Sequence, residues 1–261
     1  MITRTRYLFF DIDGTIARHY EPIPERVARA IGKCRAAGHK AFLCTARTWC
    51  DLHPALFEPG FDGVIAGAGA QVVVEGEEIF HRYLPEDLLA RTVEEIRSHA
   101  FSGVLEGTYQ IYLVPGDVPL TADFPVLSEK TPVTAELRIE KFTIHTNDSE
   151  HIRRVLAALP CLKEWYDVYP NNEGSLVEFV GKGITKESGM SRVLSYYRAS
   201  REDSVAFGDS RNDLGALSYA GFGVAMGNAP EKVRQAADYV TGTFEEDGVA
   251  LALERLGFCG L

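Results

Sequence analysis

Short apolar runs alternate with amphipathic stretches in the first quarter of the chain. Nearly continuous apolar runs occupy residues 6–10, 40–44 and 63–66. Such runs are typical of central strands that are covered on both faces. Residues 24–37 have apolar side chains at helical spacing, an early proline and Gly38 as a stop, and so predict a helix. Residues 48–57 predict a weaker helix, and the order of elements predicts a parallel sheet with right-handed crossovers.

The pattern changes in the middle of the chain. Residues 71–83 (QVVVEGEEIFHRY) alternate and carry Glu75-Gly76, which predicts a hairpin. Helices are expected at residues 85–99 and 148–159. Strands are expected at residues 109–114, 138–146 and 175–180. The middle third therefore predicts α+β structure.

Alternation of strands and helices returns from Thr185. A helical face is formed by Met190, Val193, Leu194 and Tyr197. Strands are expected at residues 204–207 and 222–225, and helices at residues 214–219, 230–237 and 246–256. The outer thirds therefore predict one α/β domain, interrupted by an inserted α+β domain.

Charge and cysteine content narrow the function classes. The 261 residues include 27 Lys and Arg against 37 Asp and Glu, a formal net charge of −10, and no basic stripe is present. This balance argues against a nucleic-acid partner. The first apolar run stops at Asp11, which leaves no room there for a secretory or membrane segment. The five cysteines are odd in number and form no Cys-x-x-Cys pair, so we expect reduced thiols in a cytoplasmic protein. No membrane partner is expected.

Four polar clusters follow predicted strands or mark the return of the α/β pattern. They are Asp11 and Asp13 in FFDIDGT, Thr45 and Arg47 in CTAR, Lys186 in GKGITKE, and Asp209, Asn212 and Asp213 in GDSRND. Open α/β sheets bind ligands at the carboxyl ends of their strands. Taken singly, each cluster has a structural explanation as a turn, a helix cap or a surface lysine. Taken together, they offer carboxylates for a hard cation and a hydroxyl with two cations for an anion, which favours phosphoryl transfer with Mg²⁺.

These motifs identify a family resemblance. The sequence resembles the haloacid dehalogenase-like (HAD) superfamily, and most closely its Cof-type branch of sugar-phosphate phosphatases. The resemblance rests on FFDIDGT, on GDSRND followed by GVAMGNAPEKVRQAADYVT, and on the tail EEDGVALALERL. It implies a Rossmann-like parallel-sheet core over residues 1–82 and 182–261. An α+β cap of the C2 type is implied at residues 83–181.

The resemblance also implies roles for the acidic residues. Asp11 is expected to attack phosphorus and form an aspartyl-phosphate. Asp13 is expected to protonate the leaving group and then to take a proton from water. Magnesium is expected on Asp11, on the backbone carbonyl of Asp13 and on Asp209. On an extended stretch residues i and i+2 share a face, so we expect Asp11 and Asp13 to point into one pocket.

The remaining motif residues are implied to hold substrate and to orient the other groups. The expected substrate-binding residues are Thr45, Ala46, Arg47 and Lys186, with Thr45 and Lys186 also catalytic. Asn212 and Asp213 are expected to orient Lys186 or metal-bound water. Lys182 competes for the cationic role, but the ITKE context favours Lys186. Arg47 is expected to point toward the cap.

Two positions depart from the branch. Ala46 replaces the usual glycine and Ala68 the usual asparagine, which leaves open the contact made at position 68. Asn171 and Asn172, in YPNNEGS, are either substrate contacts or plain loop residues.

The implied function is hydrolysis of a small phosphorylated metabolite, with a sugar phosphate as the first expectation. A phosphomutase of the same fold and a catalytically silent binding or regulatory protein remain alternatives. The expected partner is the metabolite alone, and a monomer or small homo-oligomer is expected.

Overall fold

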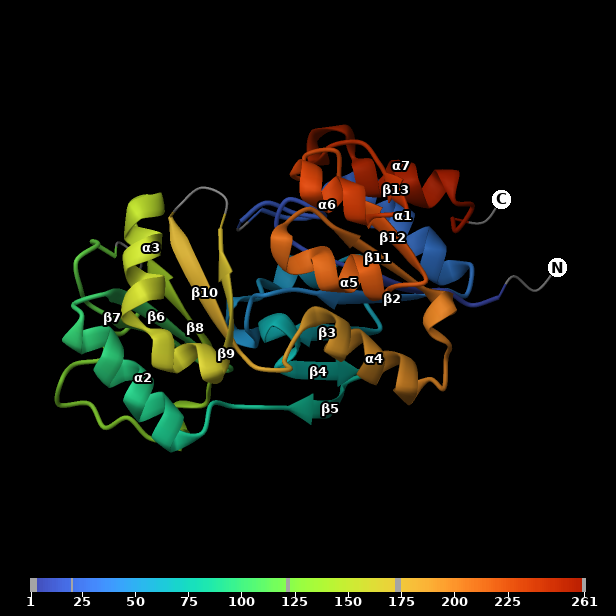
Figure 1. Cartoon of the computed structure of the whole chain (residues 1–261). Helices are drawn as coiled ribbons and strands as arrows, with labels where there is room; N and C mark the ends of the chain where they lie inside the picture. Colours follow the sequence, from blue (N-terminus) through green and yellow to red (C-terminus); the bar gives the residue numbers. More distant parts are fainter. Residues whose placement is uncertain (1–3, 20, 121–122, 172–174, 260–261) are drawn as a thin grey trace. The chain divides into compact units, whose positions relative to one another are not determined.

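The computed structural model of the protein describes residues 4–19, 21–120, 123–171 and 175–259 (Figure 1). The chain folds into two compact units, each with most of its contacts within itself. The core unit comprises Met1–Arg47, Asp51–His81 and Thr185–Leu261. The insert unit comprises Thr48–Cys50 and Arg82–Ile184. Each unit has its own sheet and its own hydrophobic core.

The core unit is built on an eight-stranded sheet in the order β13-β12-β11-β1-β2-β3-β4-β5. Its strands are β1 (Tyr7–Phe10), β2 (Lys40–Cys44), β3 (Gly63–Ala66), β4 (Gln71–Val74), β5 (Glu77–His81), β11 (Ser204–Gly208), β12 (Phe222–Ala225) and β13 (Tyr239–Val240). The strands from β13 to β3 are parallel, and β4 and β5 form an antiparallel hairpin beside them. The centre of the sheet is therefore β11-β1-β2, where side chains of both faces are buried.

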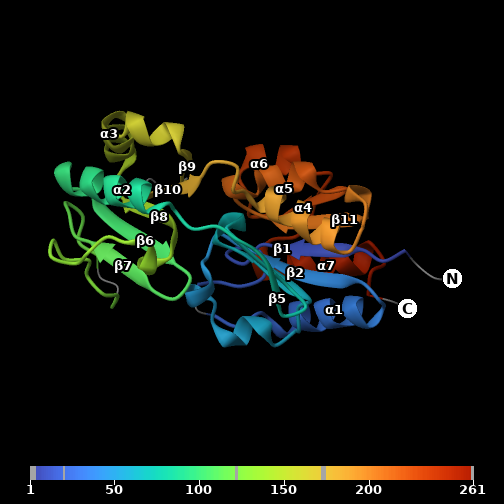
Figure 2. The same cartoon turned by 90° about the horizontal axis from the view of Figure 1, so that it is seen from below.

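Helices cover both faces of this sheet (Figure 2). They are α1 (Glu25–Ala36), α4 (Lys186–Tyr196), α5 (Leu214–Tyr219), α6 (Glu231–Ala236) and α7 (Gly248–Arg255). Apolar residues of α1 and α7 pack on one face, in a cluster with Leu8 and Phe10. Apolar residues of α4, α5 and α6 pack on the other, with Phe9 and Phe42. Because side chains alternate along β1, Leu8 and Phe10 face one helix layer and Phe9 faces the other.

The insert unit contains a five-stranded antiparallel sheet in the order β7-β6-β8-β10-β9. Its strands are β6 (Ser102–Gly107), β7 (Ile111–Val114), β8 (Ile139–His145), β9 (Tyr166–Pro170) and β10 (Leu176–Gly181). Its helices are α2 (Glu86–Ser98) and α3 (Ser149–Ala158). Both helices bury their apolar stripes in one cluster with sheet residues such as Phe142 and Phe179, so they pack on the same face.

The predicted fold class and most predicted elements are confirmed. The strands at 40–44, 63–66 and 222–225 and the helix at 214–219 have the expected bounds. The single helix expected at 48–57 is wrong, because two short 3₁₀ helices, Trp49–Asp51 and Pro54–Phe57, take its place and the second begins at a proline. The three strands expected in the middle third are present as β7, β8 and β10, but β6 and β9 were not predicted. The two-residue β13 was missed as well.

Further 3₁₀ turns connect these elements. They are Gly67–Gly69, Ala135–Leu137, Pro160–Glu164, Arg201–Asp203, Arg211–Asp213 and Phe244–Glu246. Within the described residues, no helix combines the length and the apolar character that crossing a membrane would take.

Candidate active site

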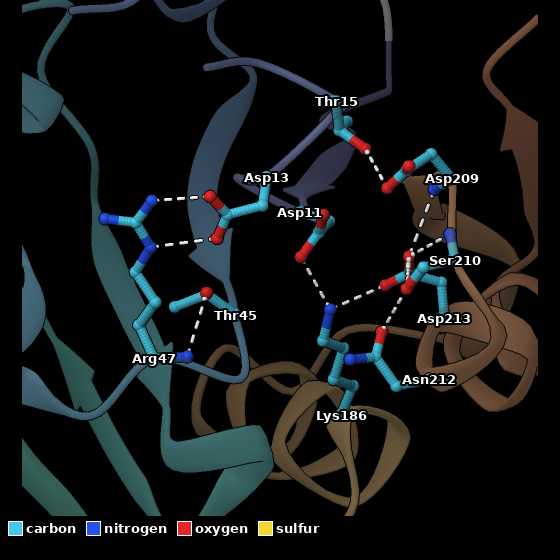
Figure 3. Close-up of polar contacts among 10 residues, drawn as sticks. All are labelled: Asp11, Asp13, Thr15, Thr45, Arg47, Lys186, Asp209, Ser210, Asn212 and Asp213. Atoms are coloured by element: carbon cyan, nitrogen blue, oxygen red, sulfur yellow. Dashed lines mark hydrogen bonds and ion pairs between the residues drawn. The ribbon is translucent and has the colours of Figure 1, made fainter. Parts of the chain in front are cut away.

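Polar side chains gather at the carboxyl ends of the three central strands of the core unit (Figure 3). Asp11 follows β1, Thr45 follows β2 and Asp209 follows β11. Because β11, β1 and β2 are adjacent and parallel, their ends lie at the same edge of the sheet. Local sequence thus places each residue at a strand end, and the sheet order brings them together.

A buried lysine links two aspartates at this edge. The Lys186 Nζ donates hydrogen bonds to Asp11 Oδ1 and to Asp213 Oδ1, each at 2.6 Å (Figure 3). Lys186 is 2% exposed, Asp11 is 6% exposed and Asp213 is 1% exposed. Buried charges of this kind are stable only when they are paired. The three residues therefore form one ionic unit.

The start of α4 holds Lys186 in place. Thr185 caps the helix, with its side chain accepting from the Ser188 backbone N–H and the Ser188 hydroxyl accepting from the Thr185 backbone N–H. A cation at a helix N-terminus is disfavoured by the helix dipole. Burial also disfavours the charge, but Asp11 and Asp213 outweigh it and raise the pKa of Lys186 well above its usual range. The lysine is therefore held as a cation by the acids around it.

The carboxyl groups of Asp11 and Asp209 are both harder to ionise than usual. Burial and the nearby Asp213 raise the pKa of Asp11, and Lys186 opposes the rise. Burial and Asp213 likewise raise the pKa of Asp209 to about 7. Asp209 also accepts hydrogen bonds from the Thr15 hydroxyl and the Asn228 side-chain amide, each at 3.4 Å.

The crowding of acids fits a divalent cation. Asp11, Asp209 and Asp213 each have a carboxylate oxygen within 4.8 Å of those of the other two. Magnesium prefers oxygen ligands and keeps several waters, so one or two carboxylates suffice. Asp213 raises the pKa of both Asp11 and Asp209, so positive charge at this site would favour their ionised forms, and a divalent ion would supply it. The donor set present here therefore suits such an ion.

Asp213 also shapes the loop after β11. Its Oδ2 accepts from the backbone N–H groups of Asp209 and Ser210, at 3.0 and 2.9 Å. A Cβ on Gly208 would lie 2.5 Å from the Asp213 side chain, so only glycine leaves room at that position. Asn212 points to the same loop, where its Oδ1 accepts from the Ser210 hydroxyl at 2.7 Å. Asp213 therefore contacts Lys186 directly, whereas Asn212 is hydrogen-bonded to Ser210.

Asp13 faces a different cation from Asp11. The Arg47 guanidinium donates to both of its oxygens, from Nε at 2.8 Å and from Nη2 at 2.5 Å (Figure 3). Arg47 is 6% exposed, whereas the Asp13 side chain is 46% exposed. The expectation of an extended stretch through both acids is wrong, because β1 ends at Phe10 and a turn begins at Ile12. His19 extends this group, with its Nδ1 3.2 Å from Arg47 Nη2.

Thr45 and Ala46 form the turn that leads to Arg47. The buried Thr45 hydroxyl accepts from the Arg47 backbone N–H at 3.1 Å. Its backbone carbonyl accepts from Ala68 N at 2.9 Å. A hydroxyl that accepts one hydrogen bond keeps its own proton for another acceptor. Thr45 is therefore available as a donor at the strand ends.

The Gly67–Gly69 turn lies against the start of α4. Ala68 adopts φ +56°, a left-handed conformation in which asparagine is more favourable than alanine. Gly69 adopts φ +108°, and a Cβ there would lie 2.3 Å from the Thr185 carbonyl oxygen. This close approach fixes the turn against the residue that caps α4.

The structure separates the two candidate lysines and adds residues that the sequence did not single out. Lys186 lies among the acids, whereas Lys182 belongs to the insert unit. Thr15, Ser210 and Asn228 were missed as individual residues, although each lies inside or beside a quoted motif. Asn228 also donates to the Gly14 carbonyl at 3.0 Å, which joins two of those motifs.

Of the two asparagines in the YPNNEGS segment, Asn171 belongs to the described residues. The Asn171 Oδ1 accepts from the backbone N–H groups of Ser175 and Leu176, at 3.0 and 3.2 Å, which is a loop-closing role. Asn172 lies outside the described residues.

Comparison with known proteins agrees with this geometry. Residues 8–253 match the family of haloacid dehalogenase-like hydrolases. The Bacillus subtilis protein YkrA is 30% identical, over 97% of this chain and 98% of that protein. The 5-amino-6-(5-phospho-D-ribitylamino)uracil phosphatase YitU of the same organism is 27% identical, with 98% of each chain covered.

A solved structure extends the similarity to the fold. The HAD subclass IIB sugar phosphatase BT4131 is 26% identical to this chain and superimposes with a TM-score of 0.82. The match covers 97% of this chain and 100% of that one, so it includes both units. The family expectation from the motifs is thereby confirmed, and the chain belongs to the haloacid dehalogenase-like hydrolases.

Proposed function

We propose that the protein is a magnesium-dependent phosphatase that hydrolyses a small phosphorylated metabolite through an aspartyl-phosphate. The observation that carries the proposal is the buried pairing of Asp11 with Lys186, beside Asp209 and Asp213, at the ends of the central strands. Attack by a carboxylate on a phosphate dianion brings two negative groups together, so it requires positive charge between them. Lys186 supplies one positive charge beside Asp11, and the acidic cluster could bind a metal ion that supplies more.

Asp11 is the proposed nucleophile. Its carboxylate attacks phosphorus, the bond to the leaving oxygen breaks, and an acyl phosphate forms on Asp11. Lys186 favours the ionised form of Asp11 and offsets the negative charge of the incoming phosphoryl group. Thr45 donates its hydroxyl proton in a hydrogen bond to a phosphoryl oxygen.

Asp13 is the proposed proton carrier. It gives a proton to the leaving alkoxide and later takes one from the water that hydrolyses the acyl phosphate, which regenerates Asp11. Both Asp13 oxygens are engaged by Arg47, so proton transfer requires this contact to open. We propose that substrate oxygens compete for the Arg47 guanidinium and release Asp13 as they bind.

Magnesium is the proposed cofactor. The residues that would hold it are Asp11, Asp209 and the backbone carbonyl of Asp13, with Asp213 beside them. When bound, the ion supplies positive charge to the phosphoryl oxygens and to the acids around them. Asp213 and Asn212 keep the loop after β11 in position.

A sugar phosphate is the proposed substrate class. Support comes from the similarity over nearly the whole chain to BT4131, which is named a sugar phosphatase. We further propose that residues 83–181 act as the cap that selects the leaving group and excludes water. YitU is named for a phosphorylated ribityl compound, which has a polyol chain in common with sugars.

The Asp11→Asn variant tests the proposal. It keeps the shape of the side chain but removes the nucleophile, so we expect phosphate release to fall by at least about 100-fold. The measurement is inorganic phosphate released with magnesium from a panel of sugar phosphates, nucleotides, flavin mononucleotide and pyridoxal phosphate. Circular dichroism of the variant controls for folding.

Two outcomes point to the alternatives. Conversion of a hexose phosphate to its isomer without free phosphate would identify a mutase. Absence of activity on the whole panel, with the wild-type protein and Asp11→Asn indistinguishable, would favour a silent binding protein.

A further inference from the structure

We propose that Cys34 and Cys259 are a reversible disulfide-forming site, oxidised by exchange with a small-molecule disulfide. Cys34 lies on α1, and Cys259 lies beyond the end of α7. Their sulfur atoms are 3.6 Å apart although the residues are 225 positions apart in sequence. This site lies outside the acidic cluster, and the inference does not depend on the proposed phosphatase activity.

Packing holds both thiols where they meet. Cys34 is fully buried in the cluster formed by α1, α7 and the central strands. Phe258 and Cys259 pack against the same cluster, and the Phe258 ring meets His39 edge-on at 5.4 Å. A disulfide has a sulfur separation of about 2.05 Å. Because Cys259 follows the last turn of α7, a small shift of the chain beyond that helix closes the gap.

A recess gives a reagent access to Cys259. The cavity has a volume of about 200 Å³ and is lined by Arg26, Arg29, Ala30, Lys33, Glu254 and Cys259. Arg26 pairs with Glu254, and Arg29 pairs with Glu25. Burial raises the pKa of the Cys259 thiol, and Lys33 opposes that rise. Cys34 is more deeply buried and its thiol pKa is raised further, so Cys259 is the first thiol to react.

The chemistry proceeds by two exchange steps. The Cys259 thiolate attacks one sulfur of the small disulfide and displaces one small thiol, which leaves a mixed disulfide on Cys259. The Cys34 thiolate then attacks the Cys259 sulfur and displaces the second small thiol. Two protein thiols and one disulfide thus become one protein disulfide and two thiols, and the two protein protons end on the released thiols.

The bond would stabilise the core unit. It would close a loop that spans most of the chain and so reduce the entropy of the unfolded state. We expect the oxidised protein to have an unfolding midpoint several degrees above that of the reduced protein, and reductant to reverse the shift.

The experiment treats the reduced, folded protein with glutathione disulfide and maps the products by mass spectrometry without reduction. The wild-type protein is expected to lose two hydrogens and to give a cross-linked peptide containing Cys34 and Cys259. Cys34→Ser is expected to stop at a glutathione adduct on Cys259. Cys259→Ser is expected to leave Cys34 unmodified.

Cys50 supplies the matched control. It is an exposed thiol that donates to the Gly107 carbonyl at 3.1 Å, and Cys50→Ser is expected to keep both the cross-link and the shift in midpoint. A stable glutathione adduct on Cys259 in the wild-type protein would overturn the proposal. So would the absence of the Cys34–Cys259 peptide under conditions that modify Cys50.

Discussion

Three acids and one lysine share the buried edge of the central strands, and their charges do not balance. Asp11 and Asp213 both use the same Lys186 ammonium group. Asp209 stands beside them, and its pKa is raised to about 7 by burial and by Asp213. Without a further cation, ionisation of Asp209 costs free energy in the folded state. Metal binding and proton binding should therefore compete at this residue.

The competition predicts how magnesium stabilises the protein as pH changes. The folded protein holds a proton on Asp209 between the ordinary carboxyl value of 3.8 and about 7, whereas the unfolded chain does not. This contribution to stability is fully present below 3.8 and is lost as pH rises through about 7. Bound magnesium should offset this loss of stability. We therefore expect magnesium to raise the melting temperature of the protein more at about pH 8 than at about pH 5. Differential scanning fluorimetry across this range measures it.

Asp209→Asn is the matched variant for this experiment. It removes the titrating carboxyl and keeps the size of the side chain. We expect the magnesium-dependent increase in melting temperature to shrink at high pH, and phosphate release to need more magnesium. An unchanged apparent magnesium constant would show that Asp209 is not a ligand.

At the scale of elements, a close contact between a turn and a helix start positions Lys186. Gly69 lies so near Thr185 that any side chain would overlap its carbonyl oxygen. Lys186 is the next residue, and its ammonium group must reach Asp11 at 2.6 Å. The Gly67–Gly69 turn therefore acts on the site through the backbone of α4.

Gly69→Ala tests this contact. The added Cβ would lie 2.3 Å from the Thr185 carbonyl oxygen, at a residue with φ +108°. We expect a loss of unfolding free energy of about 2–4 kcal/mol, because both strain and overlap must be relieved. Phosphatase activity should also fall, because the substitution displaces Lys186. Urea unfolding and phosphate release measure the two effects.

Gly76→Ala provides the control. Gly76 has φ +84° but nothing within 4 Å of an added Cβ. Only the backbone cost of about 1–2 kcal/mol applies there, and activity should be retained. Equal effects of the two substitutions on activity would refute the positioning role of the turn.

Sequence patterns predicted the elements of the core unit more completely than those of the insert unit. The strands β2 and β3 are buried on both faces and read as apolar runs. In contrast, β6 begins and ends with small residues and contains Glu106, while β9 ends in a proline. Both strands are stabilised by pairing with neighbouring strands, and this pairing is not visible in the local sequence pattern.

At the scale of the whole molecule, two separate cores suggest two unfolding events. Each buried apolar cluster lies within one unit, among the described residues. Both tryptophans of the chain, Trp49 and Trp165, belong to the insert unit. Their fluorescence therefore reports on that unit, whereas far-ultraviolet circular dichroism reports on both.

We expect the two signals to give different urea midpoints. Magnesium should move the circular dichroism transition of the core unit and leave the tryptophan midpoint unchanged, because the acidic cluster lies in the core unit. A Trp49→Phe variant isolates the signal of Trp165. Coincident transitions that move together with magnesium would show that the units unfold as one.

The sequence by itself determined which residues stand at the ends of the core strands and in what order. Those features are local, because a strand, its terminal aspartate and the following glycine are neighbours in the chain. The family motifs therefore predicted Asp11, Asp209 and Lys186 as site residues from local sequence alone. The motifs left open whether Asp213 orients Lys186 or metal-bound water, and they did not predict the pairing of Asp13 with Arg47.

Only the tertiary structure decided the pairings. Lys186 meets Asp11 across 175 positions, Arg47 meets Asp13 across 34, and Cys34 meets Cys259 across 225. Such contacts depend on sheet order, on the turn at Ile12 and on where α4 and α7 begin and end. Residue spacing gives none of these, because the geometry that joins distant segments is set by the packing of the whole unit.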